Sequence, residues 1–451
     1  MKNLRITLIA LVTGTLLLAS CGEDDPVIEQ PTQNIVEIAQ ANGFTSLAAA
    51  LTKAGLVDAL QANGSFTVFA PTNEAFDGLL AAIGQTSIDD VPASVLEQVL
   101  LYHVIDSKVL STQISDGSVA TLGGATVDLS TIGGIKVNTA NVSGAYDVEA
   151  TNGVIHTIDA VLVPPAVGQF VNTVLTPAYF NENFTTLIAA AVKADVVGTL
   201  LNTPNLTIFA PTNEAFQASG IDPAAIDVET LKAVLTYHVV GAKVLSSGIP
   251  SNAEALSGDN LYFSLVDAGN FINGDIQIGQ VDIESGSGVV HLVDKVIMPP
   301  SGNIVETAIS LSEGGEFTSL IAALQRTADE GTPAQNLLTV LQGDGPFTIF
   351  APTNAAFQAL LDSNTEWSAL NDIPLETLIN VLLYHVVPAR AYDKDLSGAI
   401  DANNELPTAL TGQNLTVDLG GLKLNTNSSI VGVNTHASNG VIHVISSVLL
   451  P

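Results

Sequence analysis

One eleven-residue segment occurs three times in the chain, and this repetition constrains the fold more than any other feature of the sequence. The copies read FTVFAPTNEAF at Phe66–Phe76, LTIFAPTNEAF at Leu206–Phe216 and FTIFAPTNAAF at Phe347–Phe357. They begin 140 and 141 residues apart, which is the size of a whole domain. The repeats of solenoid proteins recur every 20 to 50 residues or so, which excludes that architecture. The sequence therefore predicts a tandem array of one domain.

Two further landmarks recur in register with the first. A Tyr-His-Val step begins at Tyr102, Tyr237 and Tyr384, and a closing segment runs from Asn152 to Pro164, from Ser287 to Pro299 and from Asn439 to Pro451. Proline and glycine follow the first two closing segments and mark boundaries. We therefore predict three domains at residues 34–165, 166–300 and 301–451. The linkers are a few residues long, so we expect a semi-rigid rod.

The first residues have the pattern of a secretory signal peptide. Lys2 and Arg5 precede an apolar run, Ile6–Leu18, which is shorter than the roughly 20 residues that span a bilayer. We therefore predict a signal peptide over residues 1–20. Cys21 follows directly, is the only cysteine, and resembles the acylated cysteine of a bacterial lipobox. We expect Cys21 to carry a lipid, the alternative being a buried free thiol.

An acidic run, Cys21-Gly-Glu-Asp-Asp-Pro26, opens a short polar segment over residues 21–33. We interpret this segment as a lipoprotein tether, that is, a solvated linker without a further function. The run also resembles the acidic signal by which some Gram-negative bacteria place a lipoprotein on the outside of the outer membrane. We therefore expect export through the inner membrane and an outer-membrane lipoprotein that is exposed at the cell surface.

The charge of the chain limits its partners. There are 13 Lys and Arg residues against 45 Asp and Glu, for a formal net charge of -32. Clustered cations are needed to neutralise phosphates, so nucleic acid is excluded as a general partner. The acidic surface favours solubility and mutual repulsion, and loose binding of divalent cations is the alternative.

Within each repeat the pattern changes from helical to extended, which predicts an α+β fold. Apolar spacing indicates a helix from Phe44 to Leu60, and the eleven-residue motif opens with a short buried strand. Thr72 then has the character of a helix N-cap, and Phe76 stands where it can pack on Pro71, the residue before the cap, as a hydrophobic staple. The motif is therefore a folding device. The equivalent structural residues are Thr212, Phe216, Thr353 and Phe357.

The histidine of the Tyr-His step lies on the apolar stripe of a predicted helix. Leu96, Val99, Leu100 and His103 fall at positions i, i+3, i+4 and i+7. A histidine there is either a core residue hydrogen-bonded near the helix end or part of a partner-binding edge to which the adjacent tyrosine contributes an aromatic anchor. Gly-rich hairpins follow, and the closing strand is predicted over residues 154–163.

Together the three landmarks resemble the fasciclin-like domain family over nearly all of residues 32–451. The resemblance implies a wedge or sandwich of β-strands with helices packed on one side. It also implies non-enzymatic extracellular adhesion through proteins or polysaccharides. The candidate partner-binding residues carried over are Tyr102, His103, Tyr237, His238, Tyr384 and His385. Thr236 stands where the other copies have leucine, so we expect the three sites to be unequal. The closing-strand histidines His156, His291 and His443 are assigned a structural role.

No catalytic residue, cofactor or metal ligand is assigned. The sequence has no Gly-x-Ser-x-Gly, no phosphate-binding loop and no His-Glu-x-x-His. Six of the seven histidines recur at matching places, which favours structure over catalysis, and strand alternation would place His436 and His443 on opposite faces. The alternative function is a periplasmic or outer-membrane accessory module that binds a polysaccharide or small ligand. A third possibility is a hydrolase, for which the sequence offers no catalytic residues to assign.

Overall fold

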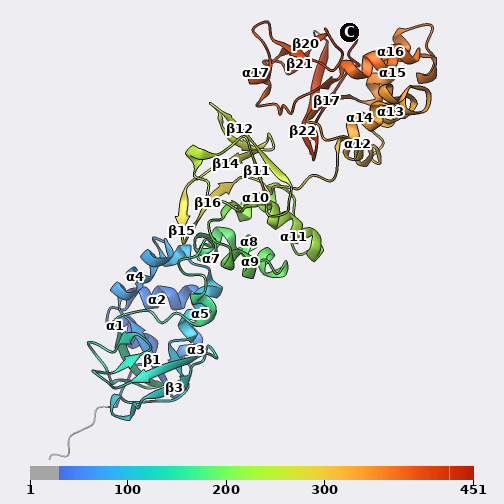
Figure 1. Cartoon of the computed structure of the whole chain (residues 1–451). Helices are drawn as coiled ribbons and strands as arrows, with labels where there is room; N and C mark the ends of the chain where they lie inside the picture. Colours follow the sequence, from blue (N-terminus) through green and yellow to red (C-terminus); the bar gives the residue numbers. More distant parts are fainter. Residues whose placement is uncertain (1–29, 426) are drawn as a thin grey trace, which may run out of the picture.

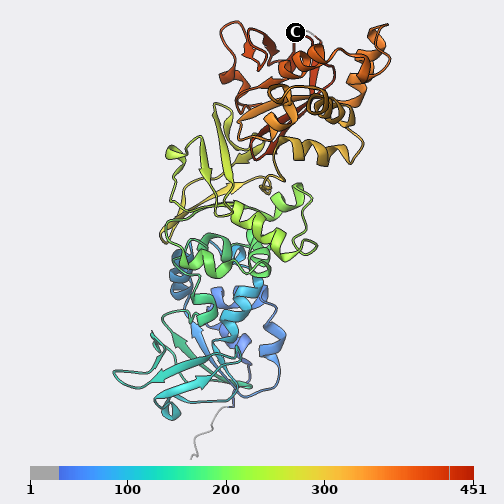
Figure 2. The same ribbon diagram turned by 45° about the vertical axis from the view of Figure 1, so that its right-hand side comes forward.

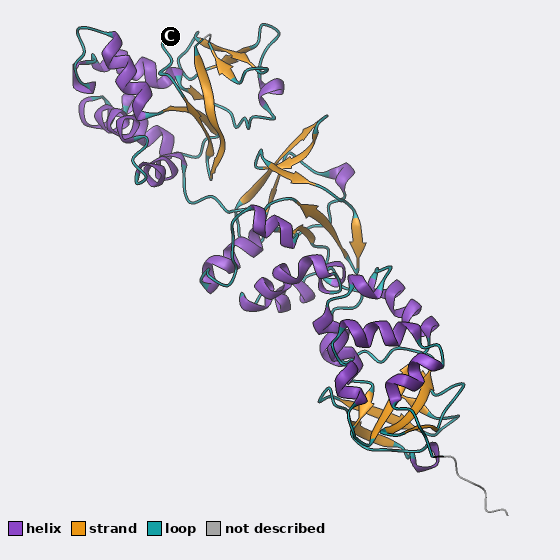
Figure 3. Ribbon diagram, turned by 180° about the vertical axis from the view of Figure 1, so that it is seen from behind, coloured by secondary structure: helices purple, strands orange, loops and turns teal. Residues whose placement is uncertain are grey.

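The computed structural model describes residues 30–425 and 427–451. The predicted signal peptide, Cys21 and most of the tether lie outside these residues. The three repeats follow one another along an elongated molecule (Figures 1 and 2). Within each repeat, helices gather on one side and strands on the other (Figure 3), so the α+β prediction is confirmed.

Each repeat opens with helices, passes through the motif strand and a second helical segment, and ends in strands. The first repeat contains α1 (Ile35–Ala41), α2 (Thr45–Lys53), α3 (Val57–Gln61), β1 (Phe66–Pro71), α4 (Asn73–Ile83), η1 (Ile88–Asp90), α5 (Ala93–Leu101), β2 (Val104–Ile105), η2 (Ser111–Gln113), β3 (Gly117–Ala120), β4 (Thr126–Ser130), β5 (Lys136–Val137), β6 (Ala140–Asn141), β7 (Val148–Ala150) and β8 (Gly153–Ile158).

The second repeat has a similar order, but two short α-helices and a 3₁₀ turn stand in place of its single first helix, and no 3₁₀ turn separates the two helices after its motif strand. It contains α6 (Pro165–Gly168), α7 (Thr176–Tyr179), η3 (Glu182–Phe184), α8 (Thr185–Lys193), α9 (Val197–Asn202), β9 (Thr207–Pro211), α10 (Asn213–Ala218), α11 (Val228–Tyr237), β10 (Val239–Val240), η4 (Ser246–Gly248), β11 (Asn252–Glu254), β12 (Asn260–Val266), β13 (Gly269–Ile272), β14 (Ile276–Ile278), β15 (Ile283–Ser285) and β16 (Gly288–Val293).

The third repeat has the longest first helices. It contains α12 (Ile304–Ser312), α13 (Thr318–Glu330), η5 (Pro333–Gln335), α14 (Leu337–Gln342), β17 (Phe347–Pro352), α15 (Asn354–Ser363), η6 (Leu370–Asp372), α16 (Leu375–Tyr384), β18 (Val386–Val387), α17 (Leu396–Ala399), β19 (Glu405–Pro407), β20 (Asn414–Asp418), β21 (Lys423–Leu424), β22 (Ser428–Ala437) and β23 (Gly440–Ile445).

Two predicted elements have different bounds in the structure. The helix predicted from Phe44 to Leu60 is two helices, because Gly55 adopts a left-handed backbone with φ of 69° between α2 and α3. The closing strand predicted to reach residue 163 ends at Ile158. Its parallel partner β1 ends at Pro71, where the chain turns into α4, so no strand remains to pair with the rest.

The motif strand and the closing strand form the parallel centre of each sheet. In the first repeat the order is β2-β1-β8-β7, with Phe69 opposite His156. One apolar core lies between this sheet and the helices, and a second lies beneath the strands that follow the Tyr-His step. Phe209 and Phe350 pair with His291 and His443 in the same way. The landmarks therefore share the centre of every repeat.

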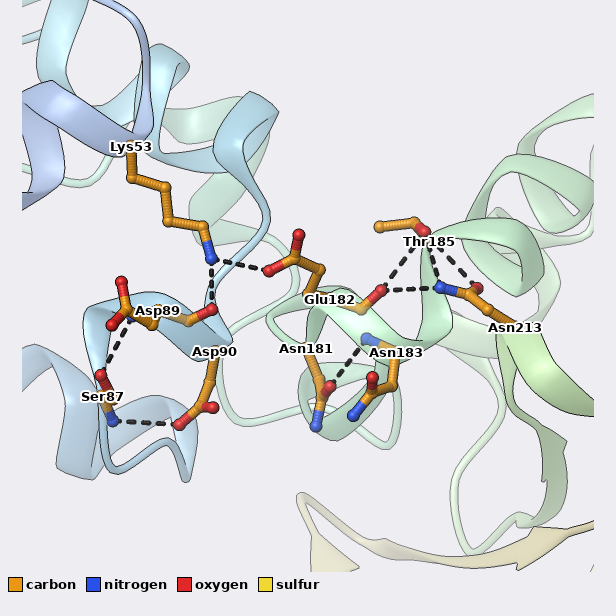
Figure 4. A network of polar contacts seen from close by, with 9 residues as sticks. All are labelled: Lys53, Ser87, Asp89, Asp90, Asn181, Glu182, Asn183, Thr185 and Asn213. Atoms are coloured by element: carbon orange, nitrogen blue, oxygen red, sulfur yellow. Dashed lines mark hydrogen bonds and ion pairs between the residues drawn. The ribbon is translucent and has the colours of Figure 1, made fainter.

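The first two repeats share a continuous apolar core. Val167 in α6 and Phe180 after α7 are buried, and they line a small void together with residues of α4 and α5. Lys53 at the end of α2 also pairs with Glu182 at 2.7 Å between Nζ and Oε2 (Figure 4). Asn213, from the second copy of the motif, holds the carbonyl of Glu182 through Nδ2 at 2.9 Å. The third repeat has core clusters of its own.

In the part of the chain that the structure describes, every helix is either too short or too polar to cross a bilayer.

Candidate functional site: the Tyr-His positions

The motif threonine caps the helix that follows it, as predicted. Thr72 Oγ1 accepts a hydrogen bond from the backbone N–H of Ala75 at 3.2 Å, and Phe76 is buried. The next residue adds a long-range contact, because the Asn73 Oδ1 accepts from the N–H of Ser46 at 3.0 Å. No local sequence pattern predicts this contact, because Ser46 and Asn73 lie 27 residues apart. The same cap is made by Thr212 and Thr353, the buried phenylalanines are Phe216 and Phe357, and the same long-range contact is made by Asn213 and Asn354.

The histidine of the Tyr-His step joins the end of its helix to the segment after the closing strand. His103 Nδ1 lies 2.7 Å from the carbonyl oxygen of Val99, and Nε2 accepts from the N–H of Leu162 at 2.9 Å. Since a carbonyl can only accept, the proton sits on Nδ1. His238 makes the same pair of bonds with Val234 and Ile297, and His385 makes it with Val381 and Leu449.

These three imidazoles are uncharged at neutral pH. Burial lowers the pKa of His103, His238 and His385 from 6.5 to about 4, against the opposing effect of the hydrogen bond to the helix carbonyl. A general acid or base works best with a pKa near the operating pH. The described environment therefore suits a structural bridge.

The tyrosine of the step is also buried, and its hydroxyl is held from two sides. Tyr102 is 3% exposed, donates to the carbonyl of Thr126 at 2.8 Å, and accepts from Nδ2 of Asn138 at 3.1 Å. Tyr237 bonds in the same way to Asn260 and Asn273, and Tyr384 to Asn414 and Asn425. Each asparagine donor has a left-handed backbone, a conformation that asparagine tolerates better than most residues.

The structure therefore favours the core interpretation of the Tyr-His step. The rings of Tyr237 and Tyr384 are 0% and 5% exposed, so they are packed inside the domain and not presented on its surface as aromatic anchors. The tyrosine lies at the end of its helix, and its ring passes under the strands that follow, so that its hydroxyl reaches the asparagine. A partner would meet the rim around the hydroxyl rather than the rings. Partner binding by these six residues remains a prediction.

Comparison with known proteins places this geometry in a family. The model of the Fasciclin domain matches residues 42–164, 182–299 and 315–451. The chain belongs to the fasciclin domain family. It is 29% identical over 434 residues to transforming growth factor-beta-induced protein ig-h3 of Sus scrofa, covering 95% of this chain and 59% of that protein.

Two further relatives show the same relationship at different lengths. Periostin of Homo sapiens is 27% identical, over 95% of this chain and 48% of its own length. Protein sll1483 of Synechocystis is 45% identical over 133 residues, which is 29% of this chain and 73% of that protein. The chain thus spans about half the length of the two longer relatives.

The closing-strand histidine supports the second half of each fasciclin domain. His156 Nε2 lies 2.8 Å from the carbonyl of Val109, Nδ1 accepts from the N–H of Asp147 at 3.3 Å, and the ring stacks on Phe69. His291 and His443 make the same contacts with Val244 and Asp282, and with Ala391 and Asn434. Within residues 30–425 and 427–451, no three His, Cys, Asp or Glu side chains converge on a possible metal position.

Proposed function

We propose that the chain is a non-enzymatic, lipid-anchored surface protein that binds extracellular proteins or polysaccharides multivalently through its three fasciclin domains. The observation that carries the proposal is the match of three successive segments to one domain family. The family resemblance implies adhesion, and the elongated arrangement supports it because it spaces several binding faces along one chain (Figure 1).

Multivalency is the mechanism of this proposal. Once one domain has bound, the next binds at a high effective concentration, so weak sites give strong attachment. The rims around the hydroxyls of Tyr102 and Tyr384 are the proposed contact positions, each at the mouth of a preformed hydrogen-bond set. The matching hydroxyl of Tyr237 lies against His436 of the third domain. The proposed domain boundaries are 34–165, 166–300 and 301–451.

The proposed location is the outer face of the outer membrane, with the chain held by a lipid on Cys21 and the acidic residues that follow as tether. Net charge supports this location, since a chain of net charge -32 repels other anionic surfaces and remains extended from them.

Protease treatment of intact cells tests the location, with detection of the mature chain and of its Cys21 lipid. The expected result is loss of the fasciclin domains from unbroken cells, while a periplasmic marker survives. Protection until the outer membrane is opened would refute surface exposure. A Cys21→Ser variant, expected in the medium or periplasm, is the control for the anchor.

A groove on the first domain favours ligand capture as the second candidate. Its volume is about 580 Å³, and its walls include Phe44, Thr72 and Glu74 of the motif, and Val148 and Thr157 from β7 and β8. Glycan and protein arrays probed with the chain lacking residues 1–21 distinguish the two functions. Binding to several immobilised partners that weakens when single domains are blocked supports adhesion. Saturable binding of a free oligosaccharide, abolished by Thr157→Arg, supports capture.

A further inference from the structure

A cluster between the second and third domains contains the one histidine without a counterpart in the other repeats. His436 lies on β22 of the third domain, and its Nε2 is 3.2 Å from the hydroxyl of Tyr237 in the second. Its Nδ1 is 2.8 Å from the hydroxyl of Tyr392 and 3.4 Å from the guanidinium of Arg390. Because Arg390 can only donate, Nδ1 accepts and Nε2–H donates to Tyr237.

Arg390 reaches the second domain as well. Its guanidinium carbon lies 3.9 Å from the centre of the Tyr262 ring, a cation–π contact, while its Nη atoms donate to carbonyls of its own domain, including those of Ala437 and Ser438. Lys394 Nζ similarly lies 5.6 Å from the Phe271 ring. These two cations of the third domain thus face aromatic rings of the second.

The other two domains have a different pair at these positions. In each domain the closing-strand histidine binds one backbone carbonyl. The residue just before that carbonyl is Lys108 in the first domain, Lys243 in the second and Arg390 in the third. The residue seven places before that histidine is Glu149, Glu284 or His436. In the first two domains these positions form a Lys–Glu ion pair. The third domain has replaced the pair with Arg390 and His436, which contact the second domain instead.

The covered face of the second domain has changed to match. Tyr262 and Phe271 stand where the first domain has Asp128 and Lys136 and the third has Thr416 and Lys423. Gly274 adjoins them, and a Cβ there would lie 2.6 Å from Tyr392 Cδ1, so the two backbones approach closely. The burial of the asparagine that binds each tyrosine hydroxyl follows the same division: Asn138 is exposed, Asn273 is 4% exposed and Asn425 is partly exposed.

We propose that the third domain is a built-in partner for the Tyr237 face of the second, docked through Arg390 and His436, so that these two domains move as one body. The corresponding faces of the first and third domains stay open. Only those two faces are free to bind other molecules, and the order of the domains is fixed by the matched residues. The docking leaves the proposed adhesive function to the open faces of the first and third domains, and its test measures domain motion rather than adhesion.

The test restores the residues of the other repeats. In the chain lacking residues 1–21, Arg390→Lys with His436→Glu rebuilds the Lys–Glu pair inside the third domain and removes both contacts to the second. The matched control, Lys108→Arg with Glu149→His, installs the arginine and histidine at the same positions of the first domain, away from the junction between the second and third domains. Small-angle X-ray scattering reports the spread of molecular lengths, and hydrogen exchange reports protection of residues 270–275.

The expected result is a broader length distribution for the Arg390/His436 double variant, with roughly tenfold faster exchange over residues 270–275, since about 1.4 kcal/mol of lost contact corresponds to tenfold. The control is expected to match the parent. A second variant, Tyr262→Thr, carries the third domain's own residue and is expected to act like the first. Unchanged scattering and exchange in both test variants, with the domains folded, would overturn the proposal. Equal broadening in the control would overturn it too.

Discussion

At the scale of the residue, the repeated polar side chains act as fixed bridges between distant segments. The histidine of each Tyr-His step needs one nitrogen to donate and the other to accept, which only the neutral ring can do. In the first domain His103 and Leu162, which it binds, are 59 residues apart in the sequence. The stability of the domain is therefore linked to the protonation of this ring.

Stability is expected to fall as the pH drops below about 6.5. The pKa of His103, His238 and His385 is about 4 in the folded chain against 6.5 for the free group, so the unfolded chain binds more protons between these values. The contribution of the neutral histidine to the free energy of unfolding is complete above pH 6.5 and is lost as the pH falls towards 4. Each domain should lose roughly 2 kcal/mol by pH 5, measured by urea unfolding. Constant stability from pH 7 to 5 would contradict this linkage.

Two substitutions of the tyrosine separate its ring from its hydroxyl. Tyr102→Ala is expected to cost about 3–5 kcal/mol, as for other large core side chains. Tyr102→Phe should cost about 1 kcal/mol, because Thr126 and Asn138 are exposed and can bond to water. Tyr237→Phe should cost more, since Asn273 is buried. Calorimetry of the three variants provides the measurement, and a fully stable Tyr102→Ala chain would return the ring to a surface role.

What could be predicted from the sequence divides by the range of the interaction. The caps of Thr72, Thr212 and Thr353 and the apolar position of His103 follow from neighbours within one helix, and these predictions hold. The acceptor of Asn138 is a hydroxyl 36 residues away, and His436 bonds to a tyrosine 199 residues away. Such partners depend on the tertiary fold. The signal available in the sequence is an asparagine that follows an apolar residue at the same place in each repeat: Asn138, Asn273 and Asn425.

At the scale of the element, the parallel pair of motif strand and closing strand holds each domain together. The closing strand begins with a glycine because helix and strand crowd that point. A Cβ on Gly440 would lie 2.3 Å from the carbonyl oxygen of Phe347 and 2.2 Å from Ile304 Cδ1. The first domain has the same crowding at Gly153, with Phe66 and Ile35. The first helix is thereby packed directly on the strand.

Adding one methyl group at this point is expected to weaken the third domain. Gly440→Ala must displace strand or helix backbone, and overpacking of this kind typically costs about 1–3 kcal/mol. Gly398→Ala is the matched control, because that glycine lies in α17 with nothing within 4 Å of the added atom. Thermal unfolding of the third domain is the measurement. Equal melting temperatures for the two variants would show that the strand pair is not the constraint.

The helix that follows the motif strand depends on its cap. Thr353→Ala removes the acceptor for the N–H of Ala356, at 3.1 Å in the structure, and should cost about 1 kcal/mol. Thr353→Ser keeps the oxygen and should cost much less. Hydrogen exchange over the first turn of α15 reads out the difference. Identical exchange in the two variants would rule out a capping contribution.

At the scale of the whole molecule, the two junctions are built differently. The first is a continuous apolar core with one partly exposed ion pair, Lys53–Glu182. Exposed pairs contribute little, so Glu182→Gln should leave the scattering profile of the chain unchanged at any salt concentration. A broader length distribution for this variant would mean that the pair, and not the core, sets the angle between the first two domains.

This difference matters when the chain is pulled from its ends. The junction of His436, Arg390 and their aromatic partners consists of directional contacts that vanish within an ångström or two of separation, so it should resist stiffly and then rupture at once. The apolar core that the first two domains share at Val167 and Phe180 resists over a longer extension, because its side chains must be exposed to water as the domains separate. Tension would thus be released first between the second and third domains, where reclosure is fast, while the first and second domains stay joined. Single-molecule stretching would record this as a short, reversible first step.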